Sequence, residues 1–177
     1  MRLQIYEQTV LAIELRHRQF GYAIYRGHRE LLDWGVRVYP AVGEAEAAMA
    51  SKRLIGLLRM FVPERIVIKT ERWNKAETNA HMRSLVEAVR HEAFAHAIPI
   101  FAVTEKDVRQ TFLNFGCETR DEIAAALARI FPELVWNLPS KRRPWQSENR
   151  QMAMFDAVAL GLAYWRHPST EVSNSPG

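Results

Sequence analysis

Two acidic residues stand in stretches of the chain that are otherwise apolar. Glu14 ends a run of Val, Leu, Ala and Ile, and Asp156 lies within a second run of apolar residues. A carboxylate in such surroundings is costly unless it pairs with a base or binds a metal ion. Glu14 could instead reach solvent or pair with Arg16 or Arg18. Asp156 could equally be a helical acid whose hydrogen bonds are satisfied locally.

Residues 137–150 form a polar, basic segment that suits a polyanion. It contains four basic residues and a tryptophan: Lys141, Arg142, Arg143, Arg150 and Trp145. A tryptophan among basic residues can stack on a base while its neighbours bind phosphates. Glu148 follows and is typical of a first helical turn. In a helix continuous from Ser147 it would lie about 12 Å from Asp156, so only an irregular first turn would bring the two together.

Two other patterns indicate no chemistry. His91 and His96 are five residues apart, whereas the zinc-protease helix has its histidines four apart on one face. Cys117 follows a glycine at a predicted turn, which favours packing of a small side chain. As the single cysteine of the chain it can form no internal disulfide, which is typical of a reducing compartment.

Hydrophobic patterning predicts the elements that position these residues. Strands are predicted at residues 9–14, 20–25, 30–39, 65–69 and 98–103. Helical spacing predicts helices at 45–60, 80–97 and 147–166, and the caps Thr104 and Thr119 begin two more. This is the order of the ribonuclease H-like fold. That α/β fold has helices on a mixed five-stranded sheet, three strands antiparallel and two parallel, with the first strand central.

Length and composition limit the classes of function. The chain has 177 residues, of which 48% are hydrophobic and 25% charged, as in one globular domain. A net charge of +4 permits a polyanion partner without demanding one. No apolar run suits a bilayer or a signal peptide, so we expect a cytoplasmic protein without a membrane partner. We predict one domain over residues 1–166 and a disordered tail at 167–177.

Four segments, in the same order along the chain, resemble RuvC, a family of Holliday-junction endonucleases. The first is the strand that ends in Glu14, with Gly21-Tyr22 seven residues later. Residues 108–116 resemble the family's Val-Lys-Gln-Thr segment, and Arg120-Asp-Glu-Ile begins the next helix as in the family. The fourth is Asp156-Ala-Val-Ala-Leu in the last helix. The resemblance covers roughly residues 9–166.

This resemblance implies metal-dependent hydrolysis of phosphodiester bonds in branched or structured DNA, carried out by a homodimer. Mg²⁺ or Mn²⁺ would be held by carboxylates. The carboxylates assigned in this way are Glu14, Glu71 and Asp156 as catalytic ligands, with Glu148 as a further metal ligand. The position of the family's second-strand glutamate corresponds to Lys69 in this chain. Glu71, two residues further on, is assigned the glutamate's role instead, because alternate residues of a strand point to the same face. An acid that the family usually has one turn before Asp156 is Ala153 here.

The predicted contacts with nucleic acid come from the same resemblance and from the basic segment. They are Lys69, Lys106, Arg109, Arg120, Lys141, Arg142, Arg143 and Trp145. The alternative for Lys106, Arg109 and Arg120 is a solvated helix face.

Three functions compete. The first is the nuclease, and the second is a catalytically impaired nucleic-acid-binding protein that keeps the fold. The second function is favoured by three departures from the family: Glu14 stands in place of an aspartate, and Ala153 and Lys69 stand in place of acids. An actin-like ATPase is excluded, because that class needs two domains and glycine-rich loops, whereas this chain has 8 glycines and no Gly-Gly pair. Lys69 could bind a phosphate, or it could pair with Glu14 or Asp156 in place of a metal. If it occupies the point where the carboxylates should meet, hydrolysis is no longer expected.

Overall fold

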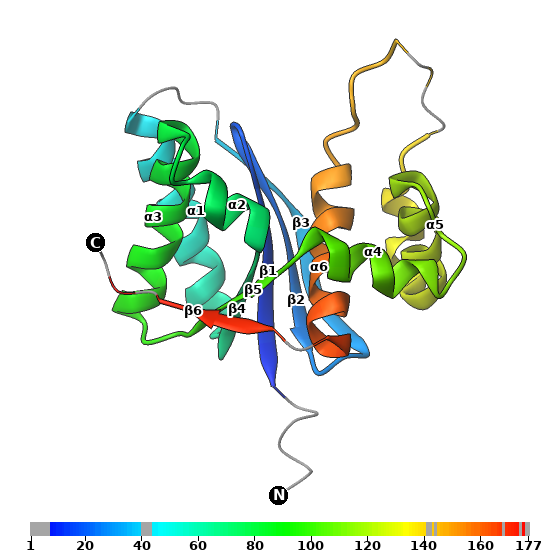
Figure 1. Ribbon diagram of the computed structural model, residues 1–177, viewed down its shortest axis with the longest axis horizontal. Helices are drawn as coiled ribbons and strands as arrows, with labels where there is room; N and C mark the ends of the chain where they lie inside the picture. Colours follow the sequence, from blue (N-terminus) through cyan, green and yellow to red (C-terminus); the bar gives the residue numbers. More distant parts are fainter. Residues whose placement is uncertain are drawn as a thin grey trace, which may run out of the picture.

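One mixed sheet of six strands forms the centre of the protein (Figure 1). The computed structural model describes residues 8–39, 44–140, 143, 145–167, 169–173 and 175. Its strands are β1 (Thr9–Arg16), β2 (Gln19–Arg26), β3 (Glu30–Val38), β4 (Arg65–Lys69), β5 (Ile100–Val103) and β6 (Thr170–Val172). They lie in the order β3-β2-β1-β4-β5-β6. Strand β1 is central, antiparallel to β2 and parallel to β4, as the sequence predicts.

The sixth strand differs from the prediction of five strands. Strand β6 pairs antiparallel with β5, within the region predicted to be a disordered tail. Its side chains are mostly exposed, which is why hydrophobic patterning gives no signal for it. A sheet edge pairs through backbone groups, so a short polar segment can still complete the ladder.

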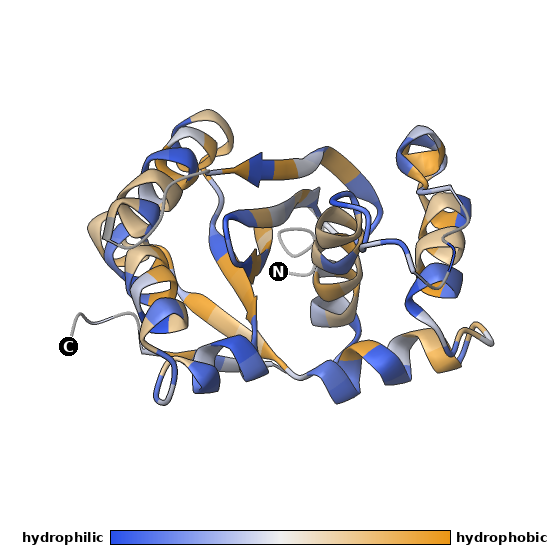
Figure 2. Cartoon of the chain, turned by 90° about the horizontal axis from the view of Figure 1, so that it is seen from above, coloured by the Kyte–Doolittle hydropathy of each residue, from blue (hydrophilic) through white to orange (hydrophobic). Residues whose placement is uncertain are grey.

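Two layers of helices cover the sheet. Helices α1 (Glu44–Phe61) and α3 (Ala80–Ala95) pack on one face. Helix α6 (Met152–Arg166) packs on the other face, and α4 (Glu105–Leu113) and α5 (Arg120–Ile130) pack against α6. A 3₁₀ helix (Pro132–Asn137) follows α5, and the short α2 (Thr70–Lys75) follows β4. Figure 2 shows the apolar strands lying between the two layers. Within the described residues, no helix is both long and apolar enough to cross a membrane.

Side-chain caps explain where helices α4 and α5 begin. Thr104 accepts a hydrogen bond from the Asp107 amide, and Thr119 forms a complete capping box with Glu122, both as predicted. The predicted start of the last helix near Ser147 is wrong, because α6 begins at Met152 and has no side-chain cap. The residues just before it are therefore irregular, and this brings Glu148 closer to Asp156 than a continuous helix would.

Helix α6 lies directly on the backbone of β2. A Cβ atom built on Gly21 would lie 1.9 Å from the Ala153 carbonyl oxygen. Gly21 is paired with Glu14 across the β1–β2 ladder. The absence of a side chain at Gly21 therefore lets α6, and Asp156 with it, approach the end of β1 that holds Glu14.

Candidate functional site

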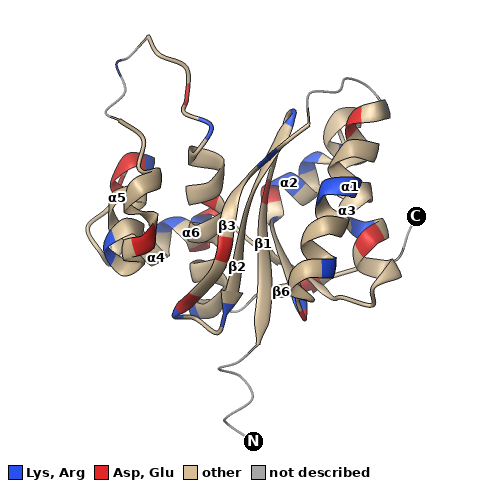
Figure 3. Ribbon diagram, turned by 180° about the vertical axis from the view of Figure 1, so that it is seen from behind, with Lys and Arg blue, Asp and Glu red and all other residues tan. Residues whose placement is uncertain are grey.

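A polar pocket of about 320 Å³ opens at the carboxyl ends of the parallel strands β1 and β4. Its lining consists of four acids and four bases: Glu14, Glu105, Glu148, Asp156, Arg16, Lys69, Arg72 and Arg120. Loops and helix starts gather at this edge of an α/β sheet, which makes it the usual position of a ligand site. Figure 3 shows that acidic and basic residues also alternate elsewhere in the molecule, along the helices and at the ends of strands.

Glu14 is fully buried in this pocket and is held by two cations. The Lys69 ammonium lies 3.3 Å from its Oε2. The Arg72 guanidinium donates to its Oε1 from Nη2 at 2.9 Å and from Nε at 3.2 Å. Pairing with a base, one of the alternatives for this acid, is what the structure shows. The pairing with Lys69, in place of a metal, is one that the sequence allows, whereas Arg72 takes the place expected of Arg16 or Arg18.

Asp156 and Glu148 share a second pair of cations. Arg16 donates to Glu148 at 2.7 Å and also to Asp156. Arg120 bonds to both acids, with its Nε 3.3 Å from the Asp156 Oδ1. Partial burial lowers the pKa of Arg120, but the charges of Asp156, Glu148 and Glu14 and the hydrogen bond to Asp156 outweigh it and raise the pKa. The guanidinium therefore stays charged and bridges the two carboxylates.

The placement predicted for Glu71 is wrong. Strand β4 ends at Lys69, and the chain turns at once into α2, so Glu71 is not on a strand face beside Glu14. Its carboxylate accepts the backbone N–H of Glu105 at 2.9 and 3.1 Å, at the start of α4. Glu71 therefore stabilises a helix N-terminus, and it is not among the residues that line the pocket.

A pair of divalent cations does not fit this pocket as it stands. Lys or Arg groups already compensate each of the three carboxylates Glu14, Glu148 and Asp156. Binding two such ions would require carboxylates free to neutralise them. Within the described residues, these acids do not approach closely enough to form a group of metal ligands. The group that does so is His17, Glu46 and His81, none of which lines the pocket.

The predicted rim of DNA contacts is only partly near the pocket. Lys69 and Arg120 line it, whereas Lys106 and Arg109 are exposed on α4 and Arg109 is paired with Glu105 at 2.9 Å. Trp145 is 76% exposed, with the Arg143 guanidinium 5.7 Å from its ring centre. Lys141 and Arg142 lie outside the described residues. The exposed tryptophan and guanidinium give a surface on which a base could stack.

Sequence reasoning missed Arg72 as a partner of Glu14. The one feature of the sequence that points to Arg72 is its position three residues after Lys69, close to the end of the same strand. Arg16, the last residue of β1, extends its long side chain into the pocket. Cys117 is buried, in agreement with a packing role.

Comparison with solved structures identifies the fold. Thermus thermophilus RuvC matches with a TM-score of 0.67 at 17% identity, over 93% of this chain and 100% of that one. The same protein in complex with a Holliday junction substrate matches with a TM-score of 0.66 at 19% identity, over 93% and 99%. A yeast mitochondrial Holliday junction resolvase gives 0.49 at 16% identity, over 92% and 82%. No family model and no curated protein matches the chain. The predicted resemblance to RuvC is thus confirmed at the level of the fold, which is ribonuclease H-like.

Proposed function

We propose that this protein binds branched DNA through the pocket at the ends of β1 and β4, without hydrolysing it. The single observation that carries the proposal is the pairing of Lys69 and Arg72 with the buried Glu14. The likeness to a RuvC structure that contains a Holliday junction supports DNA as the partner.

The charges of the pocket suit phosphate binding. Arg16 and Arg120 each form ion pairs with two carboxylates, and guanidinium groups bind phosphate and carboxylate in the same geometry. A DNA phosphate can therefore replace a carboxylate as the partner of either arginine. The acids keep the arginines ordered when no DNA is bound, which lowers the entropy lost on binding.

Hydrolysis with Mg²⁺ or Mn²⁺ is the second candidate. The observation in its favour is that Glu14, Glu148 and Asp156 line one pocket, although cations compensate all three. A twofold-symmetric junction would also suit two copies of the chain, so a homodimer is part of both proposals. The cytoplasmic location stays a prediction.

Binding and cleavage of a labelled four-way junction by the full chain separate these functions. We expect the protein to prefer the junction over a linear duplex of the same sequence, with no cleavage product in Mn²⁺ or Mg²⁺. The Arg120→Ala variant should weaken junction binding about tenfold, since it removes one phosphate partner. Arg129→Ala is the matched control, because Arg129 is an exposed residue of the same helix α5 that does not line the pocket.

Metal-dependent cleavage by the parent chain that disappears in Asp156→Asn would establish the nuclease instead. Equal affinity for junction and duplex would contradict the branched-DNA proposal in both of its forms.

A further inference from the structure

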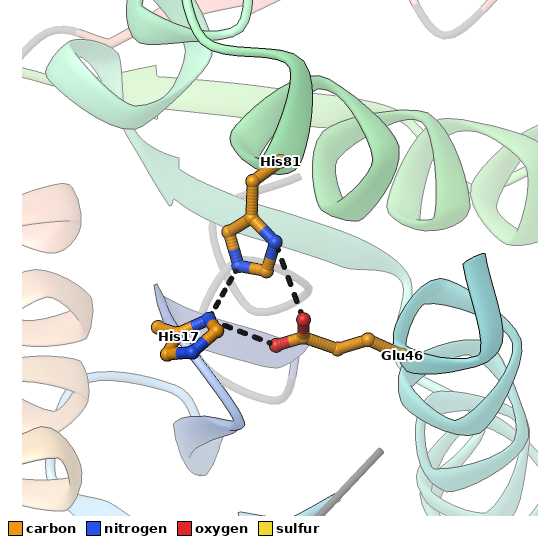
Figure 4. Close-up of side chains that lie close together, drawn as sticks. All are labelled: His17, Glu46 and His81. Carbon is orange, nitrogen blue, oxygen red and sulfur yellow. Dashed lines mark hydrogen bonds and ion pairs between the residues drawn. The ribbon is translucent and has the colours of Figure 1, made fainter. Parts of the chain in front are cut away.

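Three potential metal ligands, His17, Glu46 and His81, lie close together outside the pocket. His17 lies in that turn, Glu46 in the first turn of α1, and His81 in the first turn of α3 (Figure 4). The three side chains point toward one another. The His17 Nδ1 is 3.0 Å from the His81 Nε2 and 3.5 Å from the Glu46 Oε1, and the His81 Nδ1 is 3.2 Å from the Glu46 Oε2.

Glu46 is the unusual member of this group. It is a carboxylate that is only 1% exposed. Its Oε1 accepts the backbone N–H of Arg18 at 2.6 Å, whereas its Oε2 has no hydrogen-bond partner among the described residues. A buried carboxylate oxygen without a hydrogen bond is costly unless a positive charge faces it. His17 and His81 are neutral when they act as ligands, so an ion between the three groups would supply that charge.

The donor set selects the kind of ion. Two imidazole nitrogens and one carboxylate oxygen form a typical three-ligand zinc site, whereas Mg²⁺ and Ca²⁺ prefer oxygen ligands only. Zinc bonds of about 2.0–2.1 Å in a tetrahedron place neighbouring ligand atoms about 3.3 Å apart. One donor atom from each of the three residues lies within 4.8 Å of the other two, and the contacts of 3.0 and 3.2 Å use different ring nitrogens of His81. Only one ring nitrogen of His81 can bind a given ion, so binding requires that ring to rotate until one nitrogen faces both partners.

We propose that His17, Glu46 and His81 bind one Zn²⁺ ion, with water at the remaining position. The exposure of His17 (61%) and His81 (34%) leaves that position open to solvent. Because the ligands come from a turn and two helices, the ion links β1, α1 and α3. It also fixes the turn next to Arg16, whose carbonyl accepts the Tyr39 hydroxyl at 3.1 Å. The site is separate from the pocket proposed to bind DNA.

Metal binding to the full chain tests this proposal without any nucleic acid. After chelation and re-addition of Zn²⁺, the wild type should hold one ion per chain, measured by elemental analysis, and its thermal unfolding midpoint should rise with Zn²⁺ concentration. Co²⁺ in place of Zn²⁺ should give the visible absorption of a nitrogen- and oxygen-ligated site. His17→Ala and His81→Ala should each weaken the affinity by more than about 100-fold, since removing even an outer-shell partner costs about 10–100-fold.

The control is His91→Ala, which removes an exposed histidine of the same helix α3 and should leave the affinity unchanged. His17→Ala is the safer of the two ligand variants, because His17 is exposed in a turn and its removal leaves no core cavity. An affinity that is equal in the wild type and both ligand variants, or that falls equally in His91→Ala, would overturn the proposal. Either result leaves the DNA-binding proposal untouched.

Discussion

Lys69 decides the chemistry of the buried acid Glu14. The ammonium lies beside the one oxygen of Glu14 that accepts no hydrogen bond within the described residues, and Arg72 binds the other oxygen. A buried carboxylate with two cations is electrically satisfied, and its environment differs from that of a metal ligand awaiting an ion. The basic side chain at position 69 therefore sets the charge balance at the carboxyl ends of β1 and β4.

Replacing Lys69 should destabilise the protein. Lys69→Met leaves Glu14 Oε2 buried without a cation, which should lower the free energy of unfolding in urea by about 1–3 kcal/mol. The double variant with Glu14→Gln should cost less than the sum of the single variants, because the two groups interact directly. Lys106→Met is the control for loss of a lysine on the surface. Strictly additive costs would show that the pair contributes nothing.

At the scale of the elements, the contact between β2 and α6 sets the width of the site. Gly21 leaves room for the Ala153 carbonyl, so α6 rests on the sheet backbone itself. Asp156 lies one turn further along the same helix and reaches Arg16 at the end of β1. A wider spacing between α6 and the sheet would separate this pair.

Gly21→Ala should therefore be strongly destabilising. The added methyl group would overlap helix backbone that cannot move aside, and we expect a loss of about 3 kcal/mol, the upper end of the usual range for overpacking. Gly56→Ala is the matched control, because Gly56 lies in α1 with no atom within 4 Å of an added Cβ. That variant should gain about 0.5–1 kcal/mol in the same urea titration. Similar effects of the two substitutions would contradict the packing described.

Helix α5, which carries Arg120, depends on its capping box. Backbone N–H groups of Thr119 and Glu118 and the Thr119 side chain lower the pKa of Glu122 below its ordinary value of 4.5. Because the pKa is lowered in the folded state, the carboxylate stabilises the fold above its ordinary pKa. That contribution disappears as the pH falls through the folded pKa.

Glu122→Gln should lower the thermal unfolding midpoint at pH 7, by about 2–4 °C. The difference from wild type should shrink as the pH is lowered below 4.5. Asp121→Asn, in the same first turn, controls for loss of an acid near the helix N-terminus. A difference that stays constant with pH would contradict the role of the Glu122 charge.

For the whole molecule, a net charge of +4 says little, because acids and bases are paired within the pocket. For the proposed DNA interface, exposed Lys106 on α4 and Arg143 beside the exposed Trp145 are two further cations among the described residues.

The salt dependence of junction binding measures how many of these charges meet phosphates. The slope of log K against log salt should become shallower by about 2 in a Lys106→Ala/Arg143→Ala variant, because each phosphate that a cation neutralises contributes about one unit to the slope. Fluorescence anisotropy at several salt concentrations gives the slope. An unchanged slope would exclude both residues from the DNA interface.

The element order, the central first strand and the caps of α4 and α5 are predictable from the sequence, because hydrophobic period and capping are local properties. The conspicuous acids Glu14 and Asp156 are local signals too, and both do lie in the pocket. Strand β6 escaped prediction because sheet edges pair through the backbone. The prediction for Glu71 is wrong because it assumes that β4 continues past Lys69, whereas helix α2 begins at Thr70.

Only the tertiary structure decided which charges face each other. Glu14 meets Lys69 and Arg72, and Asp156 meets Arg120, across elements that lie far apart in the chain. His17, Glu46 and His81 likewise come from three separate elements. Spacing along a chain relates residues within one helix or strand, whereas pairs between elements depend on the register of the sheet and on how the helices rest on it. The sequence by itself therefore determined the fold and its acids, and packing determined that those acids are neutralised by bases.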